Sequence, residues 1–201
     1  MPVNGVHATA IARPLETGGE ITDREGAGPS GTDPVARRSR KVVPLRPFVE
    51  RVADPQSLDA SVEEVFQLML GLTCRRTLEP PLQEAESVTA MVGFGGALSG
   101  ACVLRSGGAA ALRLAAHMTG MEFTGIDHIV KDGMGEICNM LAGVWKGKAP
   151  ELAAHCMLSV PAVITGRDYN LHVQSPEFQL QHFYSFGEGS FEVTIICDGL
   201  Q

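Results

Sequence analysis

One stretch, residues 132–148, constrains the fold of this chain more than any other. Its sequence is DGMGEICNMLAGVWKGK. When this stretch is wound at about 100° per residue, its large apolar residues fall on one side, as a helix packed along one flank requires. These residues are Met134, Ile137, Met140, Leu141, Val144 and Trp145. The stretch therefore predicts an amphipathic helix packed on the core.

The opposite side of this helix carries a second set of residues. Asp132, Glu136, Asn139 and Gly143 fall within an arc of about 60°. A carboxylate and a carboxamide three residues apart on a helix point the same way, with Cβ atoms about 5–6 Å apart. Such a pair is a candidate site, yet a polar side opposite an apolar one is also what an ordinary solvated helix shows. The spacing alone leaves both interpretations open.

Glycines are unusually frequent in the same stretch. Gly143 offers no side chain, so another surface can approach the helix closely there. Three more glycines stand at positions 133, 135 and 147, although glycine in a helix costs about 1 kcal/mol relative to alanine. We therefore expect these glycines to serve a purpose other than helix stability.

The longer string D-x-x-G-E-x-x-N-M-L-A-G, residues 132–143, resembles the signature helix of the CheX branch of the CheC/CheX/FliY phosphatases. Residues 158–166, LSVPAVITG, resemble the strand that follows this helix in the family. The resemblance covers about residues 58–198, and a single Glu-x-x-Asn helix is typical of the CheX branch. Where the family commonly has Gly-Asn-Ala, this chain has Gly143-Val144-Trp145.

This resemblance implies a hydrolase of two-component signalling in bacterial chemotaxis, acting on the aspartyl phosphate of a CheY-like receiver domain. The phosphorylated receiver domain of a response regulator brings its own Mg²⁺ and lysine, so no cofactor of this chain's own is expected. What hydrolysis still needs is a water held in line, which is positioning work. The resemblance implies that Asn139 orients this water and that Glu136 pairs with the receiver lysine, both as catalytic residues. Asp132 and Gly143 are then the partner-binding residues.

Two other functions remain open on the sequence. In a non-catalytic receiver-binding or scaffold module, the same helix docks without orienting water, because Val144 and Trp145 reshape its rim. In a purely structural domain, the chain uses a sheet edge for assembly, and Glu136 and Asn139 are ordinary surface. No metal at His128 or Cys138 is expected, and no phosphate loop or activated Ser or Cys nucleophile is recognisable.

Composition excludes several partners and predicts a compartment. The formal net charge of −7 argues against electrostatic affinity for nucleic acid or an anionic membrane. The chain has no run of 18 apolar residues, so no membrane span is expected. Five scattered cysteines without C-x-x-C spacing indicate reduced thiols and a cytoplasmic location.

The chain divides into two parts by composition. Residues 1–54 are rich in Gly, Pro, Thr, Glu and Asp without apolar periodicity, which predicts a disordered N-terminal tail. Its basic run, residues 37–41, is either a solvated charge cluster or a weak anionic contact. Residues 55–201 are expected to form one CheX-like domain.

Within this domain we predict an α+β fold, a mostly antiparallel sheet with helices packed on one face. The first helix should be capped by Ser57 or Asp59 and bury Leu58, Val62, Val65, Phe66, Met69 and Leu70, ending at Gly71. A hairpin is expected over 87–94 and 98–104, a helix over 109–118, and strands over 157–164, 170–173, 178–186 and 190–197. The resemblance further implies a homodimer through a sheet edge.

Overall fold

The computed structural model describes residues 50–51, 53–81, 84–167, 169, 171–172, 176–187 and 189–200. The predicted tail, residues 1–54, lies almost wholly outside these ranges, so its disorder remains a prediction. None of the helices in the described part of the chain is both long and apolar enough to cross a membrane.

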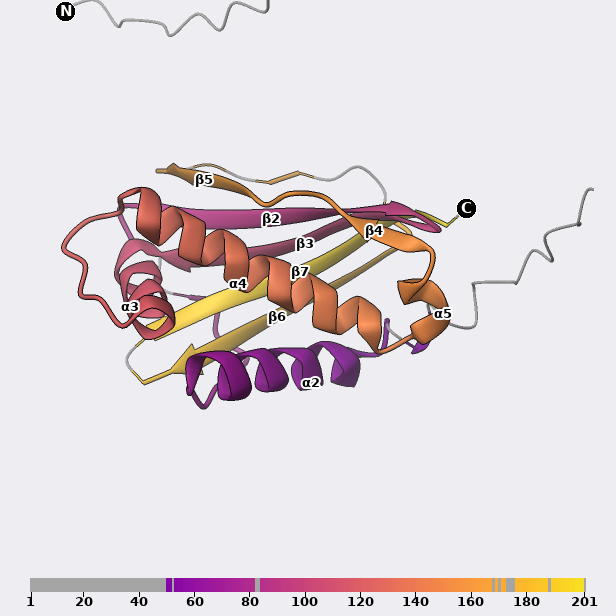
Figure 1. The fold of residues 1–201 in the computed structure, drawn as a ribbon, viewed down its shortest axis with the longest axis horizontal. Helices are drawn as coiled ribbons and strands as arrows, with labels where there is room; N and C mark the ends of the chain where they lie inside the picture. Colours follow the sequence, from indigo (N-terminus) through magenta and orange to yellow (C-terminus); the bar gives the residue numbers. More distant parts are fainter. Residues whose placement is uncertain are drawn as a thin grey trace, which may run out of the picture. The chain divides into compact units, whose positions relative to one another are not determined.

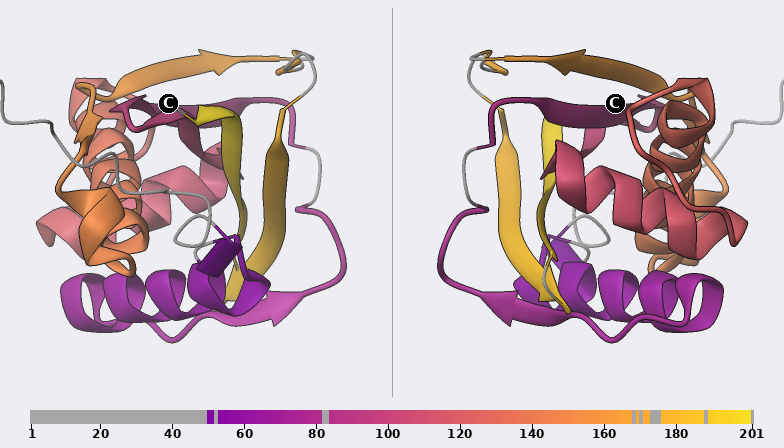
Figure 2. Two further views of the ribbon diagram at one scale, coloured as in Figure 1. Left: turned by 90° about the vertical axis from the view of Figure 1, so that its right-hand side faces the viewer. Right: turned by 90° about the vertical axis from the view of Figure 1, so that its left-hand side faces the viewer.

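The described residues form one antiparallel sheet with helices packed on one of its faces (Figures 1 and 2). The helices are α2 (Pro55–Val65), a π-helical turn η1 (Phe66–Leu70), α3 (Gly108–Thr119), α4 (His128–Gly147) and α5 (Pro150–Ala153). The strands are β1 (Arg75–Thr77), β2 (Ser87–Gly96), β3 (Leu98–Gly107), β4 (Cys156–Leu158), β5 (Ala162–Gly166), β6 (Phe178–Phe186) and β7 (Gly189–Leu200). The predicted α+β class is thereby confirmed.

The sheet has the order β1-β6-β7-β3-β2-β4, and β5 also pairs with β2. The predicted hairpin is β2–β3, which turns at Gly96 with a positive φ of 102°. The strands expected over 178–186 and 190–197 are present as β6 and β7, and the side chains on the helix-covered face of β7 are fully buried. They are Phe191, Val193, Ile195 and Cys197.

Two predicted strands were wrong in part. The strand expected over 157–164 is interrupted, because Pro161 has no N–H for the ladder and Ser159 instead exchanges hydrogen bonds with Gly93 of β2. The chain therefore forms β4 and β5 with a short break between them. Leu171 and His172, from the strand expected over 170–173, are not in a strand, and the ends of that segment lie outside the described residues.

The first helix begins earlier and ends differently than predicted. Asp54 caps α2 by accepting a hydrogen bond from the Gln56 backbone N at 3.3 Å, so neither Ser57 nor Asp59 is the cap. The helix then widens into η1, where i→i+5 hydrogen bonding rotates later residues away from their α-helical positions. Met69, expected in the core, is consequently 62% exposed. The stop at Gly71, with a φ of 65°, is as predicted.

A polar cluster attaches α2 to the sheet. Asp59 accepts hydrogen bonds from Tyr184 (2.7 Å) and His182 (2.8 Å) of β6 and pairs with Arg76 of β1 at 2.9 Å. Burial alone would raise the pKa of Asp59, but the hydrogen bonds from Tyr184 and His182, together with electrostatic attraction from His182 and Arg76, outweigh it and lower that pKa. This role of Asp59 could not be predicted from local sequence, because all three partners are distant along the chain.

The N-terminus of α3 is capped from a distance. Glu84 accepts a hydrogen bond from the Ala109 backbone N at 2.9 Å, and its carboxylate lies against Gly107 and Gly108. A carboxylate at this end of a helix satisfies an orphan donor and interacts favourably with the helix dipole.

We therefore expect Glu84→Ala to lower the free energy of unfolding by about 1 kcal/mol, the usual effect of losing a helix cap. Urea denaturation measures this change. Glu86→Ala is the matched control, since Glu86 is also exposed and contacts α3 through its backbone carbonyl, which accepts from Gly108 N. Equal losses in both variants would contradict the capping role.

The two edges of the sheet are formed by strands of different number and length. β1 forms one edge with three residues, and β4 and β5 form the other beside β2. An edge strand presents backbone groups to which another strand can pair. The homodimer through a sheet edge remains a prediction, which sedimentation of the purified chain can test.

Candidate functional site

The candidate site is one face of α4, the longest helix among the described residues. Asp127 caps this helix, accepting a hydrogen bond from the Val130 backbone N at 3.0 Å. The helix ends at Gly147, with Lys148 as its C-cap, and so covers nearly all of the stretch 132–148 in which a helix was predicted. In Figure 1, α4 crosses the sheet diagonally, so one side faces the strands and the other faces away from them.

The apolar side of α4 is the core side, as the sequence predicted. Met134, Ile137 and Trp145 are fully buried and Leu141 is 1% exposed, whereas Met140 and Val144 are half-buried at the margin. This packing fixes the rotation of α4 about its own axis. The direction of its polar side is therefore set by the core.

Polar contacts also hold α4 to its neighbours. The thiol of Cys138 lies 3.5 Å from the Ala90 carbonyl and 3.4 Å from the Cys102 carbonyl, which join α4 to β2 and β3. Near the other end, the Lys146 ammonium donates to the carbonyls of Ala153 and Cys156. Sequence reasoning missed both residues, because only the fold supplies their carbonyl partners.

The four predicted site residues lie together on the outward side of α4, in the stripe defined by Asp132, Glu136, Asn139 and Gly143. Asp132 and Glu136 are exposed, and Asn139 and Gly143 are half-buried. Among the described residues, none makes a side-chain hydrogen bond or ion pair with Asp132, Glu136 or Asn139. A Cβ added at Gly143 would meet no atom within 4 Å. The stripe is thus open to a partner along its length.

The chemistry of the stripe is that of binding and orientation. A carboxylate accepts hydrogen bonds and attracts a cation, and a carboxamide both donates and accepts, so Asn139 can hold a water molecule. Within the described residues, no three His, Cys, Asp or Glu side chains come together as a metal site. The stripe therefore has the groups to position a reaction whose reactive centre is on another molecule.

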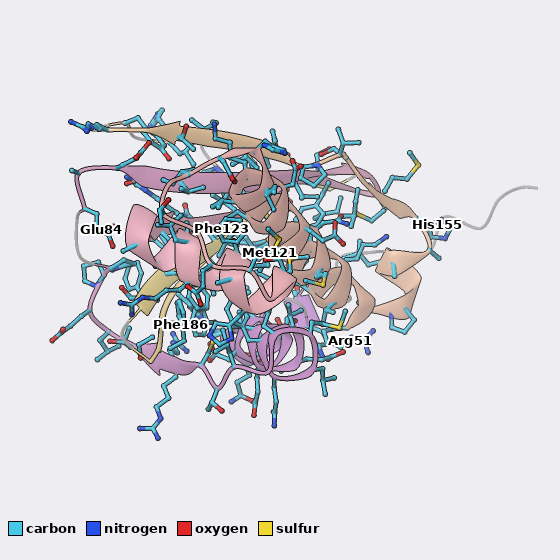
Figure 3. All side chains as sticks on the ribbon, turned by 60° about the vertical axis from the view of Figure 1, so that its left-hand side comes forward. Arg51, Glu84, Met121, Phe123, His155 and Phe186 are labelled. Carbon is cyan, nitrogen blue, oxygen red and sulfur yellow. The ribbon has the colours of Figure 1, made fainter. Side chains whose placement is uncertain are left out.

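A hollow elsewhere does not include the stripe. A cavity of about 470 Å³ lies beside α3, lined in part by Leu112, His117, Phe123 and Phe186. Figure 3 labels Phe123 and Phe186 in this region. None of the stripe residues lines this cavity, so the predicted site is a projecting helix face and not a part of that pocket.

Comparison with known proteins finds similarity in a region that includes α4. Residues 88–183, which include all of α4, match the family described as "Chemotaxis phosphatase CheX". The chain is 28% identical over 119 residues to the CheY-P phosphatase CheX of Thermotoga maritima, covering 57% of this chain and 77% of that protein.

Solved structures share the fold. The CheX crystal structure from Vibrio vulnificus is 22% identical, with a TM-score of 0.60, covering 71% of this chain and 94% of that chain. A chain of the CheX–CheY–BeF3–Mg²⁺ complex from Borrelia burgdorferi is 19% identical, with a TM-score of 0.59, covering 72% and 97%. The chain described here therefore matches the CheX family over residues 88–183 and shares the fold of CheX proteins.

Proposed function

We propose that this chain dephosphorylates the aspartyl phosphate of a CheY-like receiver domain, by presenting α4 to the phosphorylated site. The observation that carries the proposal is the pair Glu136 and Asn139, which share the outward side of a firmly packed helix and make no side-chain bonds to other described residues. A CheX relative is named a CheY-P phosphatase, and another was solved in complex with CheY.

Glu136 is proposed to anchor the complex. Its carboxylate is exposed on α4 and can pair with the ammonium of a receiver lysine. Docking would remove part of the water around this ion pair. A hydrogen bond to a charged group contributes about 1.5–3 kcal/mol to stability. The contact would fix the register of α4 on the receiver.

Asn139 is proposed to orient the attacking water. Its carboxamide, one turn after Glu136, accepts a hydrogen bond from the water and holds the oxygen in line with the phosphorus. The water oxygen then bonds to phosphorus as the bond to the aspartyl oxygen breaks. The receiver regains a carboxylate, and inorganic phosphate carries away the oxygen and protons of the water. Positioning of this kind can account for a large part of a rate increase.

The metal in this proposal belongs to the substrate. Mg²⁺ on the receiver would neutralise charge on the phosphoryl oxygens, and the chain described here would supply no cofactor of its own. The proposed division of work explains why a helix face without a nucleophile is sufficient.

The direct test is the decay of phosphorylated receiver domains with and without this chain, in Mg²⁺ buffer. A panel of receivers from the same genome identifies the cognate substrate. We expect at least one receiver to lose its phosphate faster in proportion to added chain. Binding to a phosphorylated receiver without faster decay would instead support the scaffold function, and absence of both would support a structural role.

Gly143 provides a test of close approach. A Cβ fits there without contact in the free chain, so Gly143→Ala should raise the free energy of unfolding by up to about 1 kcal/mol through helix propensity. In a complex, the same methyl group would meet the receiver. We therefore expect binding to a receiver loaded with Mg²⁺ and beryllofluoride, measured by titration calorimetry, to weaken by about tenfold.

Gly147→Ala is the matched control for this variant. Gly147 lies one turn further along α4, and a Cβ there also meets no atom within 4 Å. This variant should bind as tightly as the parent. If Gly143→Ala binds the loaded receiver as tightly as Gly147→Ala does, Gly143 is not at the interface.

A further inference from the structure

Two glycines within α4 lie in close contacts on opposite flanks of the helix. A Cβ added at Gly133 would lie 3.6 Å from the Ala115 Cβ of α3, an ordinary contact. A Cβ added at Gly135 would lie 3.1 Å from the Pro161 Cβ and 3.4 Å from Val163 Cγ2. In Figure 1 this half of α4 runs between α3 and β5. The tighter of the two contacts is therefore with the edge of the sheet.

Pro161 cannot easily retreat from α4. On one side of it, the Ser159 backbone N donates to the Gly93 carbonyl at 2.9 Å, and the Ser159 hydroxyl accepts from Gly93 N at 2.9 Å. On its other side, the β5 ladder begins at once, with Ala162 opposite Met91. Any extra atom between α4 and Pro161 would therefore displace the helix.

Asn139 is one helical turn after Gly135, so a shift of α4 at Gly135 is passed to its carboxamide. The Cys138 thiol, between these two residues, holds the buried side of α4 to β2 and β3. An added methyl group at Gly135 would therefore rotate α4 about the Cys138 contact. Groups that act by positioning tolerate errors of only about 0.5 Å. A displacement of a few tenths of an ångström at Gly135 takes up most of this tolerance.

We infer that Gly135 and Pro161 form a positioning contact, which sets the distance of α4 from the edge strand and thereby the place of Asn139 on the receiver. This inference rests on the proposed function. It also gives a purpose to a glycine that helix propensity disfavours. Gly135 acts through Asn139 and is a positioning residue, since nothing in its role requires contact with the receiver.

The test is a double-mutant cycle in the receiver dephosphorylation assay, with Gly135→Ala, Pro161→Gly and the combined variant of the full chain. Gly135→Ala should lower the rate constant at saturating chain by about tenfold, because small misplacements reduce positioning catalysis steeply. The half-saturating concentration should stay within about threefold of the parent, since the ion pair of Glu136 tolerates a small shift of α4 better than the alignment of a held water does. Gly133→Ala is the matched control and should keep the parent rate.

Rescue distinguishes positioning from a general structural effect. Pro161→Gly alone removes the ring against which α4 rests and should also slow the reaction at saturation. Combined with Gly135→Ala, it makes room for the new methyl group, so the double variant should return to within about threefold of the parent rate, which is strong non-additivity.

Several outcomes would overturn the inference. Parent activity in Gly135→Ala would do so, as would a double variant slower than both single ones, or a loss confined to the half-saturating concentration. Should Gly135→Ala fail to fold, an unchanged rate in Pro161→Gly would be decisive against it. If the parent chain does not accelerate the decay of any phosphorylated receiver, that result contradicts the proposed function, and the inference that rests on it fails as well.

Discussion

Trp145→Ala should lower the free energy of unfolding by about 3–5 kcal/mol, as truncation of buried aromatic side chains does. Trp145 is fully buried on the core side of α4. Its ring centroid lies 5.2 Å from that of Phe94 of β2, with the planes tilted by 38°. The substitution thus removes a large apolar surface and the aromatic contact that joins α4 to the sheet. Urea denaturation followed by far-ultraviolet circular dichroism measures the loss.

The matched control is Leu68→Ala. Leu68 is also a large apolar side chain but is 74% exposed in η1, so its loss should change the free energy of unfolding by less than about 0.5 kcal/mol. Trp145 is the chain's one tryptophan, and its native fluorescence should be blue-shifted relative to the unfolded chain. Red-shifted native emission, or a loss no larger than that of Leu68→Ala, would contradict the packing of α4.

Asn139→Ala should reduce the dephosphorylation rate constant at saturation by about 10²–10³, comparable to removing one group that stabilises a transition state. Its affinity for the phosphorylated receiver should stay within a few-fold of the parent, because the proposed anchor is Glu136. Glu136→Ala should behave differently and weaken binding by at least about tenfold, since the receiver lysine loses a charge-assisted partner.

Both variants should fold as the parent does, because both side chains lie on the outward side of α4 and make no side-chain hydrogen bonds or ion pairs with other described residues. Circular dichroism and unfolding midpoints check this. A rate measurement at saturating and sub-saturating chain, beside a binding titration, separates the two effects. Identical defects in the two variants would mean that the pair does not divide the work as proposed.

The sequence predicted best where local pattern and tertiary packing agree. The apolar periodicity of residues 132–148 and the strand expected over 178–186 each follow from neighbours in sequence. The resulting helix and strand occur as expected. The same periodicity predicted that the stripe residues lie together, since burial of the apolar side of α4 turns its polar side outward.

The errors arose where partners distant in sequence decide the structure. The widening at η1 exposes Met69, and no local propensity indicates it. β1 was missed because three residues carry no alternation to detect, and it forms only by pairing with β6. The glycines of α4 are unusual in the sequence, but the sequence does not predict that Gly135 lies against Pro161, which follows α4 in another segment of the chain.

The most direct test of the central claim is the rate constant for loss of phosphate from the cognate receiver at saturating chain, compared between the parent and Asn139→Ala. The account predicts that the parent accelerates the receiver's own decay by about 10²-fold or more, and that Asn139→Ala, bound equally well, leaves the decay close to its unassisted rate. Equal rate constants for the parent and Asn139→Ala would contradict the claim that the carboxamide on α4 orients the hydrolytic water.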